Sequence, residues 1–165
     1  MINGLISGLI SGFFASLIFA LFLLSLRPKI NISEDICKDP KLDNVYRIKI
    51  VNKSKVNLNN LRYSLHYCYD AGDGILDVEK IQPRKEPLDF IDRNCSENED
   101  YAIRLSFFID REKYPLDKGF LKFTVLATHS FSNTSKCFKR IYTKDNIKKG
   151  VFQGGESMRI IIDKD

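Results

Sequence analysis

The stretch from His66 to Asp70 holds the side chains best suited to chemistry in this 165-residue chain. Alternate residues of a β-strand share a face, so a strand here would present the His66 nitrogen, the Cys68 sulfur and the Asp70 oxygen together. Zinc takes these ligand types, and His129 and Cys137 on a later predicted hairpin could complete a site. The paired spacings C-x-x-C and H-x-x-x-H are absent, however. We therefore expect a reduced cysteine packed at a strand edge, and no metal.

The same cysteines and histidines are the candidates for nucleophilic catalysis. A thiolate nucleophile needs a histidine within hydrogen-bond reach and a third group that orients the imidazole ring. None of the local signatures of cysteine hydrolases stands near Cys68 or Cys137. The stretches 72–74 and 154–155 lack the lysine of a phosphate-binding loop, and the acidic residues of 70–77 lack the spacing of a calcium loop. The sequence therefore predicts a non-enzymatic protein without a cofactor.

Basic residues offer a binding surface rather than a reaction. The chain has a net charge of +5. Five cations stand on the polar side of predicted strands: Arg47, Lys49, Arg62, Arg104 and Lys122. Neighbouring strands would gather them into one cationic face, a candidate site for a small anionic molecule, a protein partner or lipid headgroups. The alternative is a solvated sheet face. The positive surplus is too moderate to predict binding of duplex nucleic acid.

An uncharged N-terminal segment must position this surface. No charged residue precedes Arg27, and small residues recur every four positions, at Gly4, Gly8, Gly12, Ser16 and Ala20. Residues 4–26 would form a helix of roughly 34 Å, enough to cross a hydrocarbon core of about 30 Å. The small residues lie close to one face, where two helices can pack closely. We predict a transmembrane helix over residues 1–27 that contacts the lipid bilayer and forms a homo-oligomer; a monomeric anchor is the alternative.

The flanks of this helix predict its orientation in the cell membrane. Arg27 and Lys29 follow the apolar run directly, and the positive-inside rule then places the C-terminal domain in the cytoplasm. No small-x-small cleavage site stands before Arg27, so we predict an uncleaved, single-pass signal-anchor. In the cytoplasm the cysteines would be reduced thiols. The opposite topology would allow two disulfides in three pairings, drawn from Cys37, Cys68, Cys95 and Cys137.

After the apolar segment the hydrophobic pattern has a period of two, which is typical of half-buried strands. The clearest alternation covers residues 46–51, 61–69, 101–109 and 121–127. Shorter candidate strands are 29–36, 75–82, 86–91, 136–143 and 157–163. Residues 110–117 could hold one helical turn before Pro115. Short strands separated by turn residues favour an antiparallel sandwich or barrel, so residues 28–165 are predicted to form one all-β domain.

A resemblance refines this fold. The stretch 46–54, which ends in Asn52-Lys53-Ser54, and the following stretch 58–65 resemble a strand pair of immunoglobulin-like modules. The layout as a whole is similar to small bacterial single-pass membrane proteins. The resemblance implies an antiparallel immunoglobulin-like β-sandwich behind one transmembrane helix, without the Cys–Trp–Cys signature of antibody domains, because the chain has no tryptophan.

These expectations combine into a hypothesis about function. We predict a membrane-anchored binding or sensing module whose cytoplasmic β-sandwich takes up a partner or a small anionic ligand while its helix self-associates. The layout is also similar to that of bacterial defence effectors that join membrane helices to a β-rich nucleotide sensor, which implies a membrane effector. The alternative is an extracytoplasmic structural or adhesion module on the same uncleaved anchor.

Overall fold

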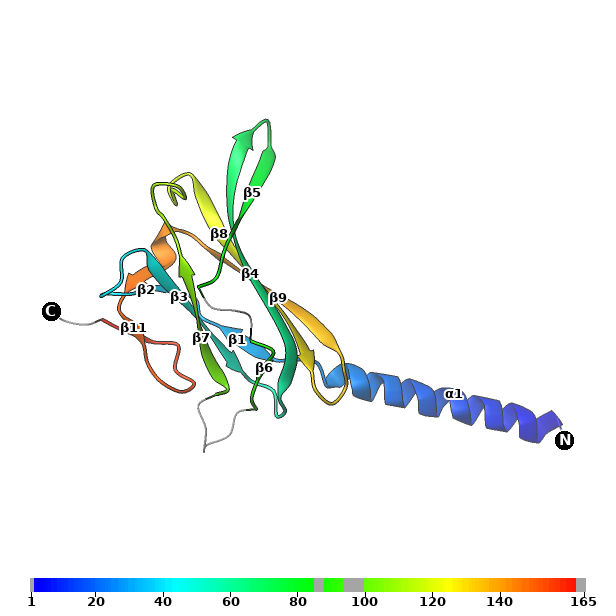
Figure 1. Cartoon of the computed structure of the whole chain (residues 1–165). Coiled ribbons are helices and arrows are strands. Elements are labelled where there is room, and N and C mark those ends of the chain that lie inside the picture. The colour runs from blue at the N-terminus through cyan, green and yellow to red at the C-terminus, as the bar shows by residue number, and fades with distance from the viewer. Residues whose placement is uncertain (1, 85–87, 94–99, 163–165) are drawn as a thin grey trace.

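A computed structural model describes residues 2–84, 88–93 and 100–162 (Figure 1). The N-terminal helix α1 runs over Ile2–Ser25 and extends away from a domain built of strands. Within the described residues it is the one helix long and apolar enough to span a membrane, and none of its most apolar stretch, Ile6–Leu23, is buried. The prediction of an N-terminal helix that is long and apolar enough to span a membrane is therefore confirmed, within the narrower bounds Ile2–Ser25.

The described strands form two larger sheets and one small one. The first sheet contains β1 (Ile30–Ile32), β2 (Ile36–Lys38), β3 (Val45–Asn52), β7 (Ala102–Phe108) and β10 (Ile147–Lys149). The second contains β4 (Leu58–Gly72), β5 (Ile75–Ile81), β6 (Phe90–Ile91), β8 (Gly119–His129) and β9 (Ser135–Tyr142). After the short helix η1 (Lys144–Asn146), β11 (Val151–Phe152) pairs with β12 (Ile160–Ile161).

Strand β3 organises the first sheet. It pairs along its length with β7, and its other edge pairs with β1 at one end and with β2 at the other. The predicted strand 29–36 is therefore wrong in its bounds, because Ser33, Glu34 and Asp35 separate two short strands. The prediction of wholly antiparallel pairing is also wrong: β10 runs parallel to β2, which makes this sheet mixed.

The second sheet has the order β5–β4–β8–β9, with β6 beside the start of β4. Here the predicted strands 61–69, 121–127 and 136–143 are confirmed within slightly different bounds. The predicted strand 86–91 lies partly outside the described residues, and its described part ends in β6. Within the predicted stretch 110–117, residues 110–114 form a single hydrogen-bonded turn, since the Tyr114 amide donates to the Asp110 carbonyl at 2.8 Å.

The two sheets share one core. Ile48 and Phe107 from the first sheet are fully buried together with Leu65 and Phe123 from the second. The Phe107 ring meets the Phe123 ring edge-on at a centroid distance of 6.0 Å. This packing explains the period of two, because each strand turns one row of side chains toward the other sheet.

Almost no linker separates α1 from the domain. The last helical residue is Ser25, and Pro28, which cannot extend a helix, is already buried. The turn between β8 and β9 lies beside the end of α1 (Figure 1). Hydroxyl groups of that turn hydrogen-bond the Leu26 carbonyl, from Ser132 at 2.8 Å and from Thr134 at 3.1 Å. These bonds satisfy a carbonyl that the end of a helix leaves without an intrahelical partner.

Candidate functional site

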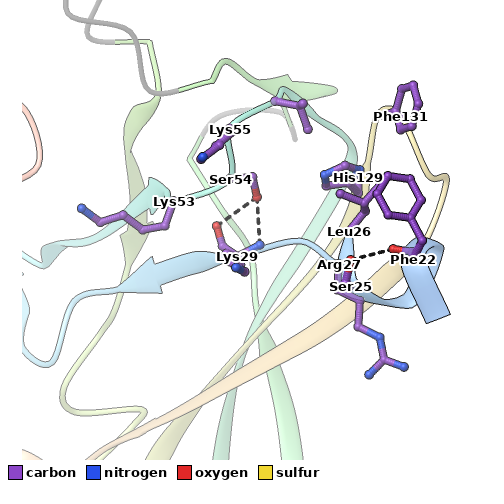
Figure 2. Close-up of a pocket in the computed structure, with 11 residues that line it drawn as sticks. Phe22, Ser25, Leu26, Arg27, Lys29, Lys53, Ser54, Lys55, His129 and Phe131 are labelled. Atoms are coloured by element: carbon purple, nitrogen blue, oxygen red, sulfur yellow. Dashed lines mark hydrogen bonds between the residues drawn. The ribbon is translucent and has the colours of Figure 1, made fainter. Parts of the chain in front are cut away.

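A cavity of about 330 Å³ lies where α1 meets the domain (Figure 2). Three segments line it: the end of the helix and the residues after it, the loop between β3 and β4, and the turn between β8 and β9. The lining residues are Phe22, Ser25, Leu26, Arg27, Lys29, Lys53, Ser54, Lys55, Val56, His129 and Phe131. We refer to this cavity as the junction pocket.

Ser54 joins two walls of the junction pocket. Its hydroxyl accepts the Lys29 amide at 2.9 Å, while the Lys53 amide donates to the Lys29 carbonyl at 2.8 Å. The side chain of Asn52 bonds the backbone of the β3–β4 loop at two points. Its Oδ1 accepts the Ser54 amide at 2.8 Å, and its Nδ2 donates to the Val56 carbonyl at 2.9 Å. The β3–β4 loop is therefore fixed against the chain that follows α1.

His129 supports the third wall. Its side chain is buried, and its Nδ1 atom accepts the Ser132 amide at 3.2 Å. Burial lowers the pKa of the imidazole below its usual 6.5, which favours the neutral ring that this acceptor role requires. The neutral ring thus holds Ser132 in the turn where its hydroxyl reaches Leu26. At the tip of the same turn, Phe131 is 72% exposed.

The junction pocket is cationic at its rim and apolar at its helix end. Four cations line it, Arg27, Lys29, Lys53 and Lys55, and none of the lining residues that the structure describes is acidic. Figure 2 shows Arg27 and Lys53 extending to different sides, while Phe22, Leu26 and His129 lie close together. Lys53 forms an ion pair with Glu156 at 2.5 Å. Arg27, Lys29 and Lys55 have no ion-pair partner within the described part of the chain.

The structure does not gather the five basic residues of the predicted cationic face. Arg47, Lys49 and Arg104 belong to the first sheet, whereas Arg62 and Lys122 belong to the second. Lys49 is 1% exposed, and its Nζ donates to the carbonyls of Gln153 at 2.6 Å and Ser157 at 2.8 Å. Arg47 forms an ion pair with the buried Asp39. The single face is wrong because the sandwiched core separates the two sheets and a C-terminal segment covers Lys49.

His66 and Cys68 lie on β4, but their neighbours do not form a metal site. In register His66 stands between Lys80 of β5 and Lys122 of β8. Burial and then these two cations lower the pKa of His66. Cys68 is fully buried, and burial raises the pKa of its thiol. Among residues 2–84, 88–93 and 100–162, no group of three or more potential ligands could hold a metal ion.

The other described cysteines are also free thiols. Cys37 is buried, with its Sγ 2.7 Å from the Gly150 carbonyl, and burial raises its pKa to about 11. Cys137 is exposed on β9. Cys95 lies outside the described residues. The buried thiols are poor nucleophiles at neutral pH because little of either is ionised.

The small-residue row of α1 is open along its length. A Cβ atom added at Gly4, Gly8 or Gly12 would meet no atom within 4 Å. Ser16 turns its hydroxyl back to the Gly12 carbonyl at 2.8 Å and so presents little polar surface, and Ala20 continues the row one turn later. Self-association through this row stays a prediction.

Sequence reasoning missed most of the junction pocket. It identified Arg27 and Lys29 only as an orientation signal, and it identified Asn52-Lys53-Ser54 only as the end of a stretch that resembles an immunoglobulin-like strand pair. Phe131 in the otherwise polar turn Ser130–Thr134 was visible in the sequence, but a single apolar residue in a turn is ordinary and does not by itself indicate a site. No family model and no curated protein matches this chain, so its function is argued from the geometry of the helix–domain junction.

Proposed function

We propose that this chain is a non-enzymatic, single-pass membrane protein whose β domain is a binding or sensing module held directly at the bilayer surface. One observation carries the proposal: the Leu26 carbonyl at the end of the candidate span is bonded by Ser132 and Thr134 of the domain. A binding event that shifts the β8–β9 turn would therefore act on the helix. A partner protein or a small anionic ligand is the class of molecule that the basic surplus favours.

The strand connectivity supports an immunoglobulin-like sandwich. The chain lays β1 and β3 in the first sheet, passes to β4 and β5 in the second, returns for β7, and ends with β8 and β9 in the second. Immunoglobulin-like modules follow this alternation, and in their second sheet, as here in β4–β8–β9, the sixth strand lies between the third and the seventh. The parallel strand β10 is an addition at the edge of the first sheet.

A cytoplasmic domain is the orientation we propose. Arg27 and Lys29 immediately after the span favour it through the positive-inside rule. The free thiols of Cys37, Cys68 and Cys137 are compatible with a reducing compartment. Cys137 tests this orientation, because it is exposed. A membrane-impermeant maleimide should label it only after cells are permeabilised, and labelling of intact cells would favour the extracytoplasmic alternative.

We propose further that α1 associates with a second copy along Gly4, Gly8 and Gly12. The open space at these glycines and the small residues that continue the row support close helix packing. The test is amine cross-linking of the full chain in membranes. Gly8→Leu with Gly12→Leu should abolish the dimer band, whereas Ile10→Leu with Phe14→Leu on the opposite face should preserve it. Equal dimer yield in all three proteins would refute the glycine interface.

A further inference from the structure

We infer that the junction pocket binds the phosphate headgroup of an anionic glycerophospholipid, with its cations around the phosphate and Phe22, Leu26 and Phe131 against the glycerol and the first acyl carbons. This inference rests on the proposed function in one respect, which is that α1 spans the bilayer. The inference names a ligand class and places its site at the helix–domain junction instead of on a face of either sheet.

The first argument is the depth of the pocket. Phe22 belongs to the candidate span Ile6–Leu23, while Arg27 and Lys29 follow its end, so the cavity extends from hydrocarbon depth to headgroup depth. An amphipathic cavity at this boundary matches an amphipathic ligand. A soluble anion would use only the polar half of it.

The second argument is charge. Among the described residues, four cations and no carboxylate line the cavity, and only Lys53 of the four has an ion-pair partner there, Glu156. Exposed, unpaired cations close to a membrane surface are attracted to anionic lipids, each contributing about five-fold in affinity. Lysine and arginine also have long apolar stems, which can follow the wall of the cavity while the charge reaches a phosphate.

The third argument is preorganisation. Ser54 fixes the backbone of Lys29, and the Lys53 amide fixes the carbonyl of the same residue. Ser132 and Thr134 fix the helix end beside His129. The walls that carry Lys29 and Lys55 are therefore already in place, so lipid binding needs to order only the flexible side-chain ends.

The fourth argument is the exposed Phe131. Its ring is 72% exposed at the tip of the β8–β9 turn, and that turn lies beside the end of α1. If this ring enters the membrane–water interface, part of its apolar surface is removed from water, which is favourable. The bilayer itself thus covers the open side of the junction pocket.

The test uses the full chain in nanodiscs that contain equal amounts of phosphatidylglycerol and phosphatidylcholine, with bound lipids counted by native mass spectrometry. The wild-type chain should retain phosphatidylglycerol preferentially. Lys29→Gln with Lys55→Gln should lower this preference by about 30-fold, and Lys29→Arg with Lys55→Arg should retain it. The matched control removes two exposed cations outside the pocket, Lys41→Gln with Lys118→Gln, and should behave as the wild type.

Equal retention of the two lipids by the wild-type chain, or equal loss in the pocket and control variants, would overturn the lipid site. A further arm adds sn-glycerol 3-phosphate or inorganic phosphate in large excess. Displacement of phosphatidylglycerol by either would assign the pocket to soluble phosphates and overturn the lipid assignment. Co-elution of chain and nanodisc reports insertion separately, so a chain that fails to insert refutes the proposed anchoring, while an inserted chain without lipid preference refutes this inference alone.

Discussion

Lys49 and Lys29 are the same residue type in two regions with opposite consequences. On the first sheet, a C-terminal segment covers Lys49, and its ammonium group donates to two backbone carbonyls. At the helix–domain junction, Lys29 is fixed only through its backbone, and its charge faces solvent. The first cation is part of the folded structure, whereas the second is available to a ligand. Burial by a distant segment, rather than residue type or strand position, separates these roles.

The largest effect should come from Lys49→Met. The substitution removes both charge-assisted hydrogen bonds, to the carbonyls of Gln153 and Ser157, which should cost about 3 kcal/mol of unfolding free energy. Lys29→Met should change it by less than about 0.5 kcal/mol. Urea unfolding of the full chain in detergent micelles measures both. Similar losses of unfolding free energy in the two variants would contradict the difference between Lys49 and Lys29.

The next effect concerns how firmly the helix end is held. Ser132→Ala with Thr134→Val removes both hydrogen bonds to the Leu26 carbonyl, each contributing about 1 kcal/mol. Local opening at the junction should become at least about ten-fold more frequent. Trypsin cleavage after Lys29 reports this opening. Ser130→Ala, in the same turn, is the control; a cleavage rate equal to that of the control would mean that the bonds do not hold the junction.

A smaller effect should follow from pH, through the one buried histidine of the junction pocket. Because burial holds the pKa of His129 below 6.5, the unfolded chain takes up a proton at a higher pH than the folded chain. This contribution to stability is complete above about pH 6.5 and is lost as the pH falls toward the folded-state pKa. His129→Gln should reduce the loss measured by unfolding at a series of acidic pH values. An unchanged pH profile would assign the loss to other groups.

The smallest effect should appear on the second sheet, where Lys122 stands beside His66. Removing this cation with Lys122→Gln should raise the pKa of His66, because Lys122 is one of the charges that lower it. Burial should still keep the pKa below the ordinary value. NMR titration of the His66 ring measures the shift. No change would mean that Lys122 acts as a solvated charge, like Lys29.

Sequence patterns predicted the elements better than their partners. Alternation located β3, β4 and β8 because each has one face on the shared core. It could not reveal that β10 returns to pair in parallel with β2, since that pairing joins residues 36–38 with residues 147–149. Lys49 was misplaced for the same reason: the carbonyls that bind it lie more than a hundred positions later in the chain.

The junction pocket was even harder to predict from the sequence, because it is built entirely from distant segments. Its walls come from three segments, around residues 22–29, 53–56 and 129–131, and no local pattern indicates that these meet. Only the chemistry of the single segments was visible in the sequence, such as the cations that follow the apolar run. What brings them together is a set of hydrogen bonds made by Ser54, Ser132 and Thr134.

The short connection at Leu26 also fixes the rotation of α1 about its own axis relative to the β domain. A helix that passes into its domain without slack cannot rotate about its own axis independently of that domain. If two copies meet along Gly4, Gly8 and Gly12, the azimuth of those glycines selects which sides of the two β domains face each other. One alanine inserted after Leu23 would turn the glycine row by about 100° relative to the domain and so present a different pair of surfaces. In such a dimer, the helix would specify how the two β domains are oriented toward each other.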